Sequence, residues 1–430
     1  MGLRGIGSPT IAFVALNPLG IDRGGGSACA SAAILEGISA VTTVDLFYLA
    51  PGPSAGIDDA LRLRFPSVRN VHAIRGRPGG RHLTRLAFAL RGLPLTLARL
   101  VSSGALATLR SLHTNPEIDV VHYDFMSWLF LHSRLRGPTK PLICTGHDAF
   151  SLAYRRKAEF QSGALLAARD RLAASAFARF ERRYLGLADA MHFVAAGDIA
   201  YLVGRGVRGR FVQINMPIEA RWFETNAQRE FSNPTHRFLL SGPFDQPWYS
   251  NGAQSFLEAT WPSVVARHPA ARCEVHCPGI EGALRAKFES IPGVTLTGWV
   301  DDYREVFRRN DFFVHPLLTG TGQKNRLAVA LAQGLCCFAT RAAAADMGLN
   351  AGNDFVLLDQ LDARAAGTIS DVAGNAAVAR TLAERGTRHV LSNFAALSVG
   401  PRFLELYRST LSCRSSDQPD RSRPRAAVEK

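Results

Sequence analysis

The sequence has no long uninterrupted apolar run, which excludes a conventional membrane-spanning helix of about 20 apolar residues. Its best candidate, residues 92–109, is broken by Arg99, Ser102 and Ser103. The apolar run at residues 11–16 is too short for a signal peptide and leads into three glycines instead of a cleavage site. We therefore expect a cytoplasmic protein.

Cysteine is scarce, with 7 residues in a chain of 430, and Cys336 and Cys337 are adjacent. An odd number of thinly spread cysteines excludes a secreted disulfide scaffold and fits a reducing compartment. Cys273, His276 and Cys277 form the one cluster that suggests a metal. On a strand, however, the two cysteines share one face and the histidine points to the other. We expect no metal site.

Two phosphate-binding patterns do not apply to the glycine-rich turns. The glycines at residues 24–26 lack the G-x-G-x-x-G spacing of the dinucleotide fingerprint, and the sequence contains no G-x-x-x-x-G-K-[ST] phosphate loop. A nucleotide-dependent dehydrogenase and a P-loop nucleotidase therefore lack support.

Acidic residues are absent from residues 60–116, which hold ten arginines. Residues 1–217 contain 26 Lys and Arg against 14 Asp and Glu, whereas residues 218–430 contain 24 and 22, within a formal net charge of +14. Arg81, Arg85 and Arg91 are interleaved with leucines and a phenylalanine. This pattern leaves three alternatives: contact with an anionic membrane or the acceptor, nucleic-acid binding, or a solvated surface. No nucleic-acid motif accompanies the stretch, so we rank membrane contact first and expect no nucleic-acid partner.

What the chain does contain is an alternation of short apolar runs and helix-length segments, which predicts an α/β protein with parallel sheets. Two sets of about five strands indicate two doubly wound domains. We expect domains at residues 1–215 and 216–395, a helix at 396–413 that packs back on the first domain, and a disordered tail at 414–430. The strands are expected at 10–16, 43–48, 118–122, 141–145, 190–194, 237–241, 271–276, 294–296, 311–315 and 336–339, and helices at 28–38, 81–99, 165–184, 254–267, 303–309 and 325–333.

Two glycine turns follow predicted strands and open predicted helices. The first holds Gly24, Gly25, Gly26 and Ser27, and its alternative interpretation is a flexible turn. The second holds Gly320, Thr321, Gly322, Lys324, Asn325 and Arg326. Basic side chains are disfavoured at a helix N-terminus, so two of them there indicate an anionic ligand such as a diphosphate.

The segment from Phe238 to Leu349 contains a series of short motifs in a fixed order: Ser241-Gly242-Pro243-Phe244, Asn251, Trp261-Pro262, His268-Pro269, Pro292-Gly293-Val294, Thr297-Gly298-Trp299-Val300-Asp301, Asp311, His315-Pro316-Leu317, Gly320-Thr321-Gly322, Asn325-Arg326, Ala330, Ala332, Gly334, Ala339-Thr340 and Gly348-Leu349. In the order and spacing of these motifs the segment resembles the C-terminal domain of family-four glycosyltransferases, in particular those associated with exopolysaccharides. Weaker matches in the first half are Gly24–Gly26, Val121-His122, Thr145-Gly146-His147-Asp148, Phe180-Glu181-Arg182-Arg183 and Ala188-Asp189.

This resemblance implies the GT-B fold, in which two Rossmann-like domains face each other across a cleft. It implies transfer of a sugar from a UDP- or GDP-type donor to a glycan or lipid-linked acceptor, usually with retention at the anomeric carbon and without a metal or other cofactor. His147 matches a histidine that contacts the donor sugar, with Asp148 beside it, and Arg326 matches a basic residue at the diphosphate. The two glycine turns would hold the donor, and the first domain would hold the acceptor.

The sequence departs from the family pattern at two positions where glutamates are common. Thr321 and Val329 stand there, and valine cannot accept hydrogen bonds from a ribose diol. A basic pair that the family often carries after the first strand of the second domain is also missing, because residues 242–249 contain no Lys or Arg. Two alternatives follow: the donor is held differently, with Lys324 and Arg326 on the diphosphate, or the protein is a non-catalytic relative.

If the basic stretch contacts membranes, reversing the charge of Arg81, Arg85 and Arg91 to Glu should reduce co-flotation with anionic liposomes, because each lost cation weakens attraction to the surface. Neutral liposomes serve as the control for both proteins. Equal flotation of the wild type and the triple variant with anionic lipid would remove the membrane hypothesis.

Overall fold

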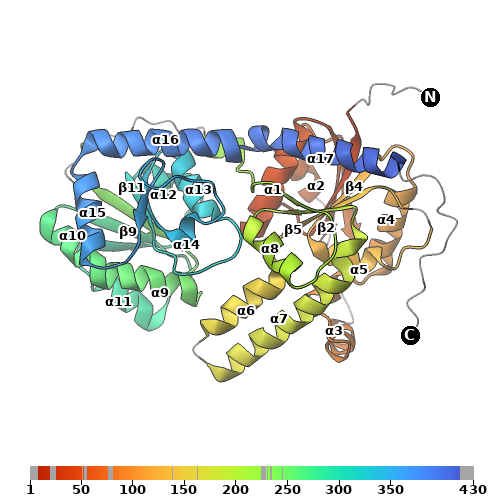
Figure 1. Cartoon of the computed structure of the whole chain (residues 1–430), viewed down its shortest axis with the longest axis horizontal. Coiled ribbons are helices and arrows are strands. Elements are labelled where there is room, and N and C mark those ends of the chain that lie inside the picture. The colour runs from red at the N-terminus through yellow and green to blue at the C-terminus, as the bar shows by residue number, and fades with distance from the viewer. Residues whose placement is uncertain are drawn as a thin grey trace.

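The computed structural model describes residues 8–19, 26–50, 52, 56–75, 81–137, 139–161, 163–223, 229, 231–232, 235–244 and 246–416. These residues form two domains, each built around one parallel sheet with helices on both faces (Figure 1). The predicted α/β class and the two doubly wound domains are therefore confirmed.

The first sheet has seven strands in the order β3-β2-β1-β4-β5-β6-β7, and all neighbours are parallel. The order reverses direction between β1 and β4, which is the switch point where ligands bind in doubly wound sheets. The strands are β1 (Thr10–Ala15), β2 (Thr43–Ala50), β3 (Asn70–Arg75), β4 (Val120–Asp124), β5 (Leu142–His147), β6 (Ala190–Phe193) and β7 (Phe211–Gln213).

Helices connect these strands and cover both faces of the sheet. The longest pair, α6 and α7, forms a hairpin that projects from the first domain (Figure 1). The helices of this half are α1 (Gly26–Ser39), α2 (Ile57–Arg64), α3 (Arg81–Leu90), η1 (Leu95–Leu100), α4 (Ser103–Thr114), η2 (Met126–Trp128), α5 (Leu129–His132), α6 (Phe150–Glu159), α7 (Ala164–Tyr184), η3 (Leu185–Leu187), α8 (Ala196–Gly204) and η4 (Ala220–Trp222).

The second sheet has six parallel strands in the order β10-β9-β8-β11-β12-β13, with its switch point between β8 and β11. The strands are β8 (Arg237–Ser241), β9 (Arg272–His276), β10 (Val294–Thr297), β11 (Phe312–His315), β12 (Cys336–Thr340) and β13 (Val356–Leu358). The helices are α9 (Pro247–Ser255), η5 (Phe256–Thr260), α10 (Trp261–Arg267), α11 (Gly282–Glu289), α12 (Tyr303–Arg308), α13 (Asn325–Ala332), α14 (Arg341–Ala344), α15 (Ala363–Ala373), α16 (Ala376–Phe394) and α17 (Ala396–Ser416).

Each sheet is buried on both faces, which explains why its strands are apolar at consecutive positions. Along a strand, successive side chains enter different clusters: Cys336 packs on one face of the second sheet and Cys337 on the other. The adjacent cysteines are therefore core residues, and burial raises the pKa of both thiols.

The chain crosses between the domains twice. It passes from the core of the first domain at Met216 to that of the second at Ile218, which pairs with Ala395. After α16 it returns as α17, which runs across the first domain (Figure 1) and packs on α1. The Tyr407 hydroxyl shares a 2.8 Å hydrogen bond with His122 Nδ1 inside the first core.

The contact between α1 and α17 depends on two glycines. A Cβ on Gly400 would lie 2.2 Å from the carbonyl oxygen of Gly37, and a Cβ on Gly37 would lie 2.6 Å from that of Ala396. Only glycine at both positions lets the two helix backbones touch. This close crossing positions α17 along the first domain.

The predicted strand count was wrong, because β3, β7 and β13 were not predicted. β7 and β13 have three residues each, and β3 alternates buried with exposed positions. Such short or half-exposed edge strands carry little apolar signal. The ten predicted strands all exist; β8 has the predicted bounds, and the other nine differ at one or both ends.

Two predicted helices are interrupted. The helix expected at 81–99 ends at Leu90, and Gly92 follows with a left-handed φ of 60° before the 3₁₀ helix η1. The helix expected at 254–267 begins earlier, at Pro247, and contains the π-helical turn η5. Pro262 lacks an N–H to donate to the preceding turn, which accounts for that irregularity.

The prediction of a disordered tail at 414–430 is wrong for residues 414–416, which are helical. α17 extends to Ser416, because the Arg414 guanidinium pairs with Asp189 at 2.7 Å and also donates to the Thr139 carbonyl. Residues 417–430 lie outside the described residues. Within the described ranges, no helix combines the length and apolarity that crossing a bilayer requires.

The helix crossing gives a stability test. We expect Gly400→Ala to lower the free energy of unfolding by about 1–3 kcal/mol, because the added methyl group overlaps the Gly37 carbonyl. Gly204→Ala is the matched control, since a methyl group at this position, the end of α8, would have nothing within 4 Å. Urea denaturation measures both, and equal stability of the two variants would contradict this role of the paired glycines.

Candidate functional site

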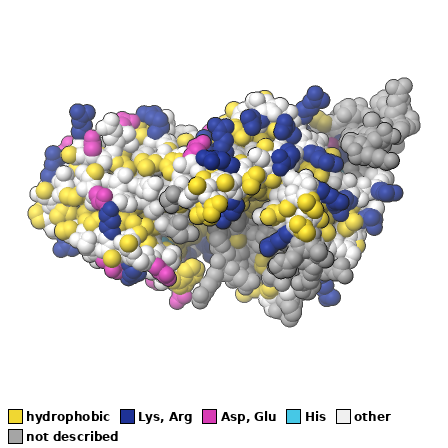
Figure 2. Space-filling model, turned by 90° about the horizontal axis from the view of Figure 1, so that it is seen from below, with side chains coloured by type: hydrophobic (Ala, Val, Ile, Leu, Met, Phe, Trp, Pro, Cys, Tyr) yellow, Lys and Arg dark blue, Asp and Glu magenta, His cyan; other side chains and the backbone are white. Residues whose placement is uncertain are grey.

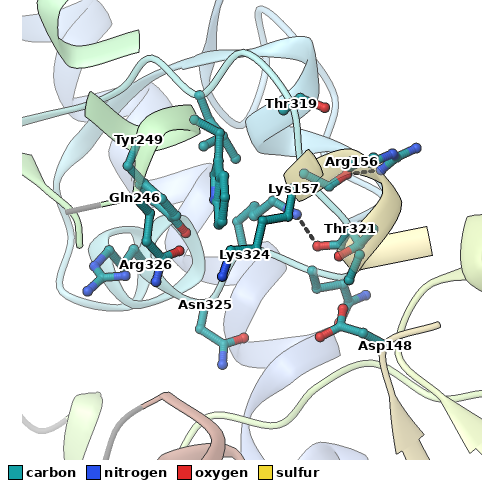
Figure 3. Close-up of a pocket in the computed structure, with 15 residues that line it drawn as sticks. Asp148, Arg156, Lys157, Gln246, Tyr249, Thr319, Thr321, Lys324, Asn325 and Arg326 are labelled. Atoms are coloured by element: carbon teal, nitrogen blue, oxygen red, sulfur yellow. Dashed lines mark hydrogen bonds between the residues drawn. The ribbon is translucent and has the colours of Figure 1, made fainter. Parts of the chain in front are cut away.

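A cavity of about 290 Å³ lies between the two domains, at the carboxyl ends of their strands. Its second-domain wall follows β8 and β11, the two strands at the switch point of the second sheet. Its first-domain wall follows β5 and includes α6 (Figure 3). The lining residues are Asp148, Ala153, Arg156, Lys157, Gln246, Trp248, Tyr249, Leu317, Thr319, Gly320, Thr321, Gln323, Lys324, Asn325 and Arg326.

The glycine turn after β11 meets the first domain directly. Gly322 has a left-handed φ of 62°, and a Cβ there would lie 2.3 Å from Asp148 Oδ1. The Arg156 guanidinium donates to the Gly320 carbonyl from the other side. Gly322 is therefore required for both its backbone conformation and the close approach of the domains.

Gln323 fastens the same turn to the crossing between the domains. Its side-chain carbonyl accepts from the Met216 N–H at 2.7 Å, and its amide donates to Asn215 Oδ1 at 2.8 Å and to the Asp346 carbonyl at 2.7 Å. Gly197 in α8 donates to the Asp346 carboxylate at 3.3 Å. These contacts hold the turn against the first domain at several points.

Lys324 is buried, with 7% of its surface exposed, and its ammonium folds back into the turn. Nζ donates to the Gly322 carbonyl at 2.7 Å and to the Thr321 carbonyl (Figure 3). Burial lowers the pKa of Lys324, and the nearby charges of Asp148 and Asp198 oppose that shift. Lys324 therefore shapes the turn from within.

Arg326 lies beside two tyrosines. Its guanidinium carbon lies 5.7 Å from the centre of the Tyr249 ring, and Tyr303 is also close enough to affect its charge. Among the described residues, its buried Nε has no hydrogen-bond partner. Figure 3 shows Arg326 with Gln246 and Tyr249 on one side of the cavity, across from Arg156 and Asp148.

Polar side chains at strand ends line the space beneath Arg326. Ser241 at the end of β8 bonds the Tyr303 hydroxyl and lies 3.4 Å from His276 Nδ1 at the end of β9. Burial, followed by the charge of Arg326, lowers the pKa of His276 to about 4 and that of His315 to about 3. Both imidazoles are therefore neutral near pH 7.

His147 points into the first domain instead of lining the cavity. Its Nε2 lies 2.7 Å from Asp124 Oδ1, and its ring packs against that of Phe125 at a tilt of 32°, with centroids 4.2 Å apart. His147 has a φ of 59° and Phe125 one of 98°, so two residues with side chains adopt left-handed backbone conformations side by side. Such strain persists only where the surroundings impose it. The contact of His147 with a donor sugar stays a prediction, whereas Asp148 does line the cavity.

The first glycine turn is only partly described. Gly24 and Gly25 lie outside the described residues, α1 begins at Gly26, and the side chain of Ser27 is also outside them. Of the basic stretch, Arg81 begins α3 but its side chain is not described, while Arg85 and Arg91 are exposed. Neither Arg85 nor Arg91 lines the cavity.

Sequence reasoning missed the first-domain residues that reach the cavity, Arg156 and Lys157. The run Arg155-Arg156-Lys157 is visible in the sequence, but nothing there shows that α6 turns it toward the second domain. Asp198 was also missed, and its charge effect on Lys324 arises through tertiary contact between α8 and the turn.

No group of three or more potential metal ligands occurs among the residues that the structure describes. Cys273 and Cys277 both enter the same core cluster, while His276 bonds Ser241. Burial raises the pKa of Cys277 to about 11, so this thiol stays protonated near pH 7.

Comparisons with known proteins identify the fold. Residues 235–371 match the family model described as "Glycosyl transferases group 1". Three similar solved structures are HepE from Anabaena in complex with UDP and glucose, sucrose-phosphate synthase from Thermosynechococcus elongatus, and TarM. HepE gives a TM-score of 0.62 at 13% identity, covering 93% of this chain and 100% of HepE.

The other two structures agree equally well over nearly the whole chain. Sucrose-phosphate synthase gives a TM-score of 0.65 at 18% identity, and the alignment covers 94% of this chain and 100% of the synthase chain. TarM gives a TM-score of 0.66 at 8% identity, covering 94% of this chain and 99% of the TarM chain. No curated protein sequence matches significantly. The chain thus has the GT-B fold, and the resemblance of the second domain to the glycosyltransferase family is confirmed.

Asp198 generates a pH prediction. Burial, with the charge of Asp148, raises the pKa of Asp198 to about 7 from an ordinary value of 3.8. Between these values the folded carboxyl is protonated while the unfolded one is ionised, so stability falls as pH rises from about 4 to 7. Above pH 7 the folded protein bears the full free-energy cost of the ionised, buried Asp198 carboxylate. Asp198→Asn removes the charge and should stabilise the protein at pH 8 by on the order of 3 kcal/mol, but little near pH 4.

Urea denaturation from pH 4 to 9 measures the effect. The exposed variant Asp359→Asn is the control, because 72% of that side chain lies in solvent, and it should change stability little at any pH. A stability difference for Asp198→Asn that is the same at pH 4 and pH 8 would contradict the raised pKa.

Proposed function

We propose that this protein is a glycosyltransferase that moves a sugar from a UDP- or GDP-type donor to a glycan or lipid-linked acceptor. The observation that carries the proposal is the cavity at the switch point of the second sheet, where the Gly320–Gly322 turn leads into α13. Backbone N–H groups at such a helix start favour a diphosphate. HepE, which shares the fold, is complexed with UDP and glucose, and this supports a nucleotide-sugar donor.

The chemistry requires departure of a nucleoside diphosphate, so groups that stabilise negative charge on the leaving group lower the barrier. The Gly320–Gly322 turn and the side chain of Asn325 line the cavity at this place. Arg326 also lines the cavity and supplies positive charge there, with its guanidinium packed against the Tyr249 ring. Asp148, on the opposite wall, is placed to hold hydroxyls of the transferred sugar. We propose retention at the anomeric carbon and no requirement for a metal or other cofactor.

A second candidate is a non-catalytic relative that binds a nucleotide sugar or glycan without turnover. Val329 favours it, because this side chain in α13 is apolar and 9% exposed and offers a ribose no hydrogen bond. The cavity itself is compatible with both candidates. Turnover, rather than binding, separates them.

We propose a cytoplasmic location with peripheral membrane contact through the first domain, in the biosynthesis of cell-surface polysaccharide or glycoconjugate. On α3, Leu86 and Leu90 are 58% and 81% exposed beside Arg85. Figure 2 shows Lys and Arg spread over the first domain on this face, with most Asp and Glu over the second. Exposed leucines among arginines suit an anionic bilayer surface, where a lipid-linked acceptor would lie.

The proposal predicts binding of a UDP- or GDP-sugar by the wild type and its slow hydrolysis or transfer. Arg326→Ala should lower the rate at least about tenfold, because a charge that stabilises the leaving group is lost. Calorimetry measures binding and a coupled nucleotide-release assay measures turnover. Arg341→Ala is the control, since that side chain is 80% exposed.

Binding without turnover by the wild type would favour the non-catalytic candidate. Failure of the wild type to bind any nucleotide sugar would overturn the glycosyltransferase proposal and leave only a glycan-binding relative. Thermal melting of Arg326→Ala shows whether the variant remains folded after loss of its contacts with Tyr249 and Tyr303.

A further inference from the structure

The cations around the cavity differ in whether they already have partners. Among the described residues, four basic side chains line it: Arg156 and Lys157 from α6, and Lys324 and Arg326 from the second domain. Lys324 is bonded to two carbonyls of its own turn and lies near Asp148 and Asp198. Arg326 packs against the Tyr249 ring, with its guanidinium carbon 5.7 Å from the ring centre. Lys324 is thus committed to its own turn, and Arg326 is packed against an aromatic ring.

The first-domain cations are differently placed. Within the described parts of the chain, neither Arg156 nor Lys157 forms an ion pair, whereas their neighbour Arg155 lies 3.7 Å from Glu159. Arg156 donates to the Gly320 carbonyl, and Lys157 lies 5.9 Å from the Tyr154 ring. The one carboxylate in the lining, that of Asp148, faces Gly322 and the Lys324 charge. The α6 wall therefore carries positive charge that no described acid neutralises.

We propose that Arg156 and Lys157 form a phosphate-binding site on the first-domain wall of the cavity. Arg156 offers the planar fork that suits phosphate oxygens, and Lys157 adds a compact charge at the next position. The segment between β8 and α9 and the start of α9 contain no Lys or Arg at residues 242–249. Arg156 and Lys157 thus add positive charge for a phosphate from the domain opposite the glycine turn.

This inference rests on the proposed function and adds a requirement to it. A phosphate held by Arg156 also lies next to Gly320, because the guanidinium contacts that residue. The ligand would then bridge the two domains, so that phosphate binding and domain approach stabilise each other. The phosphate can belong to the donor diphosphate or to a phosphorylated acceptor, and the experiment separates these sources.

The experiment titrates the full chain by calorimetry with UDP, uridine, inorganic pyrophosphate and inorganic phosphate. Arg156→Ala and Lys157→Ala should each raise the Kd for UDP about tenfold or more, because each removes a charged contact to phosphate. The Kd for uridine should not change, since uridine has no phosphate. Lys157→Ala leaves the Arg156–Gly320 contact intact, and thermal melting checks that both variants are folded.

Arg155→Ala is the matched control, because Arg155 lies on the same helix, is 60% exposed and pairs with Glu159. Weaker binding of UDP and pyrophosphate assigns the site to the donor. Weaker binding of inorganic phosphate with unchanged UDP binding assigns it to an acceptor phosphate. Either result supports the site.

The same Kd values in Arg156→Ala, Lys157→Ala and Arg155→Ala for all four ligands would overturn the proposal. If the wild type binds pyrophosphate but no nucleotide or nucleotide sugar, the proposed function fails while the phosphate site still stands. If the wild type binds none of the phosphate compounds, the phosphate site is wrong as well.

Discussion

The arrangement of this molecule depends on the buried ammonium of Lys324. By donating to the carbonyls of Thr321 and Gly322, it fixes the shape of the turn after β11. A buried charge is costly without partners, and Asp148 supplies opposite charge from the first domain. The first domain therefore stabilises the charge that shapes the turn. Turn geometry, cavity shape and domain approach are linked through this one electrostatic constraint.

Most of the fold was predictable, because strands buried on both faces are continuous apolar runs. The strands β1, β8 and β12 show this pattern clearly and were predicted within one or two residues. β7 was not predicted, because its three residues are all partly exposed at the sheet edge. The helix predicted at residues 81–99 ends at Leu90, because the left-handed backbone at Gly92 has no signature in the sequence beyond the glycine itself.

The candidate site was predictable in part. The spacing from β11 to α13 predicts the Gly320–Arg326 turn, because a parallel strand followed by glycines and a helix has few possible geometries. Side-chain direction was not predictable. Lys324 and Arg326 occupy the expected positions, yet tertiary contacts with Asp198, Tyr249 and Tyr303 decide where their charges point.

The route of α17 has a consequence for protein engineering. This helix follows the second domain in sequence, yet Phe403 and Tyr407 belong to the core of the first. A chimaera that exchanges the second domain with that of a relative therefore needs two junctions, one between Met216 and Ile218 and one near Ala395. A single junction would join a foreign final helix to α1, and the paired glycines Gly37 and Gly400 would no longer match. In such an exchange, α17 must be kept together with the first domain, because the two form one structural unit.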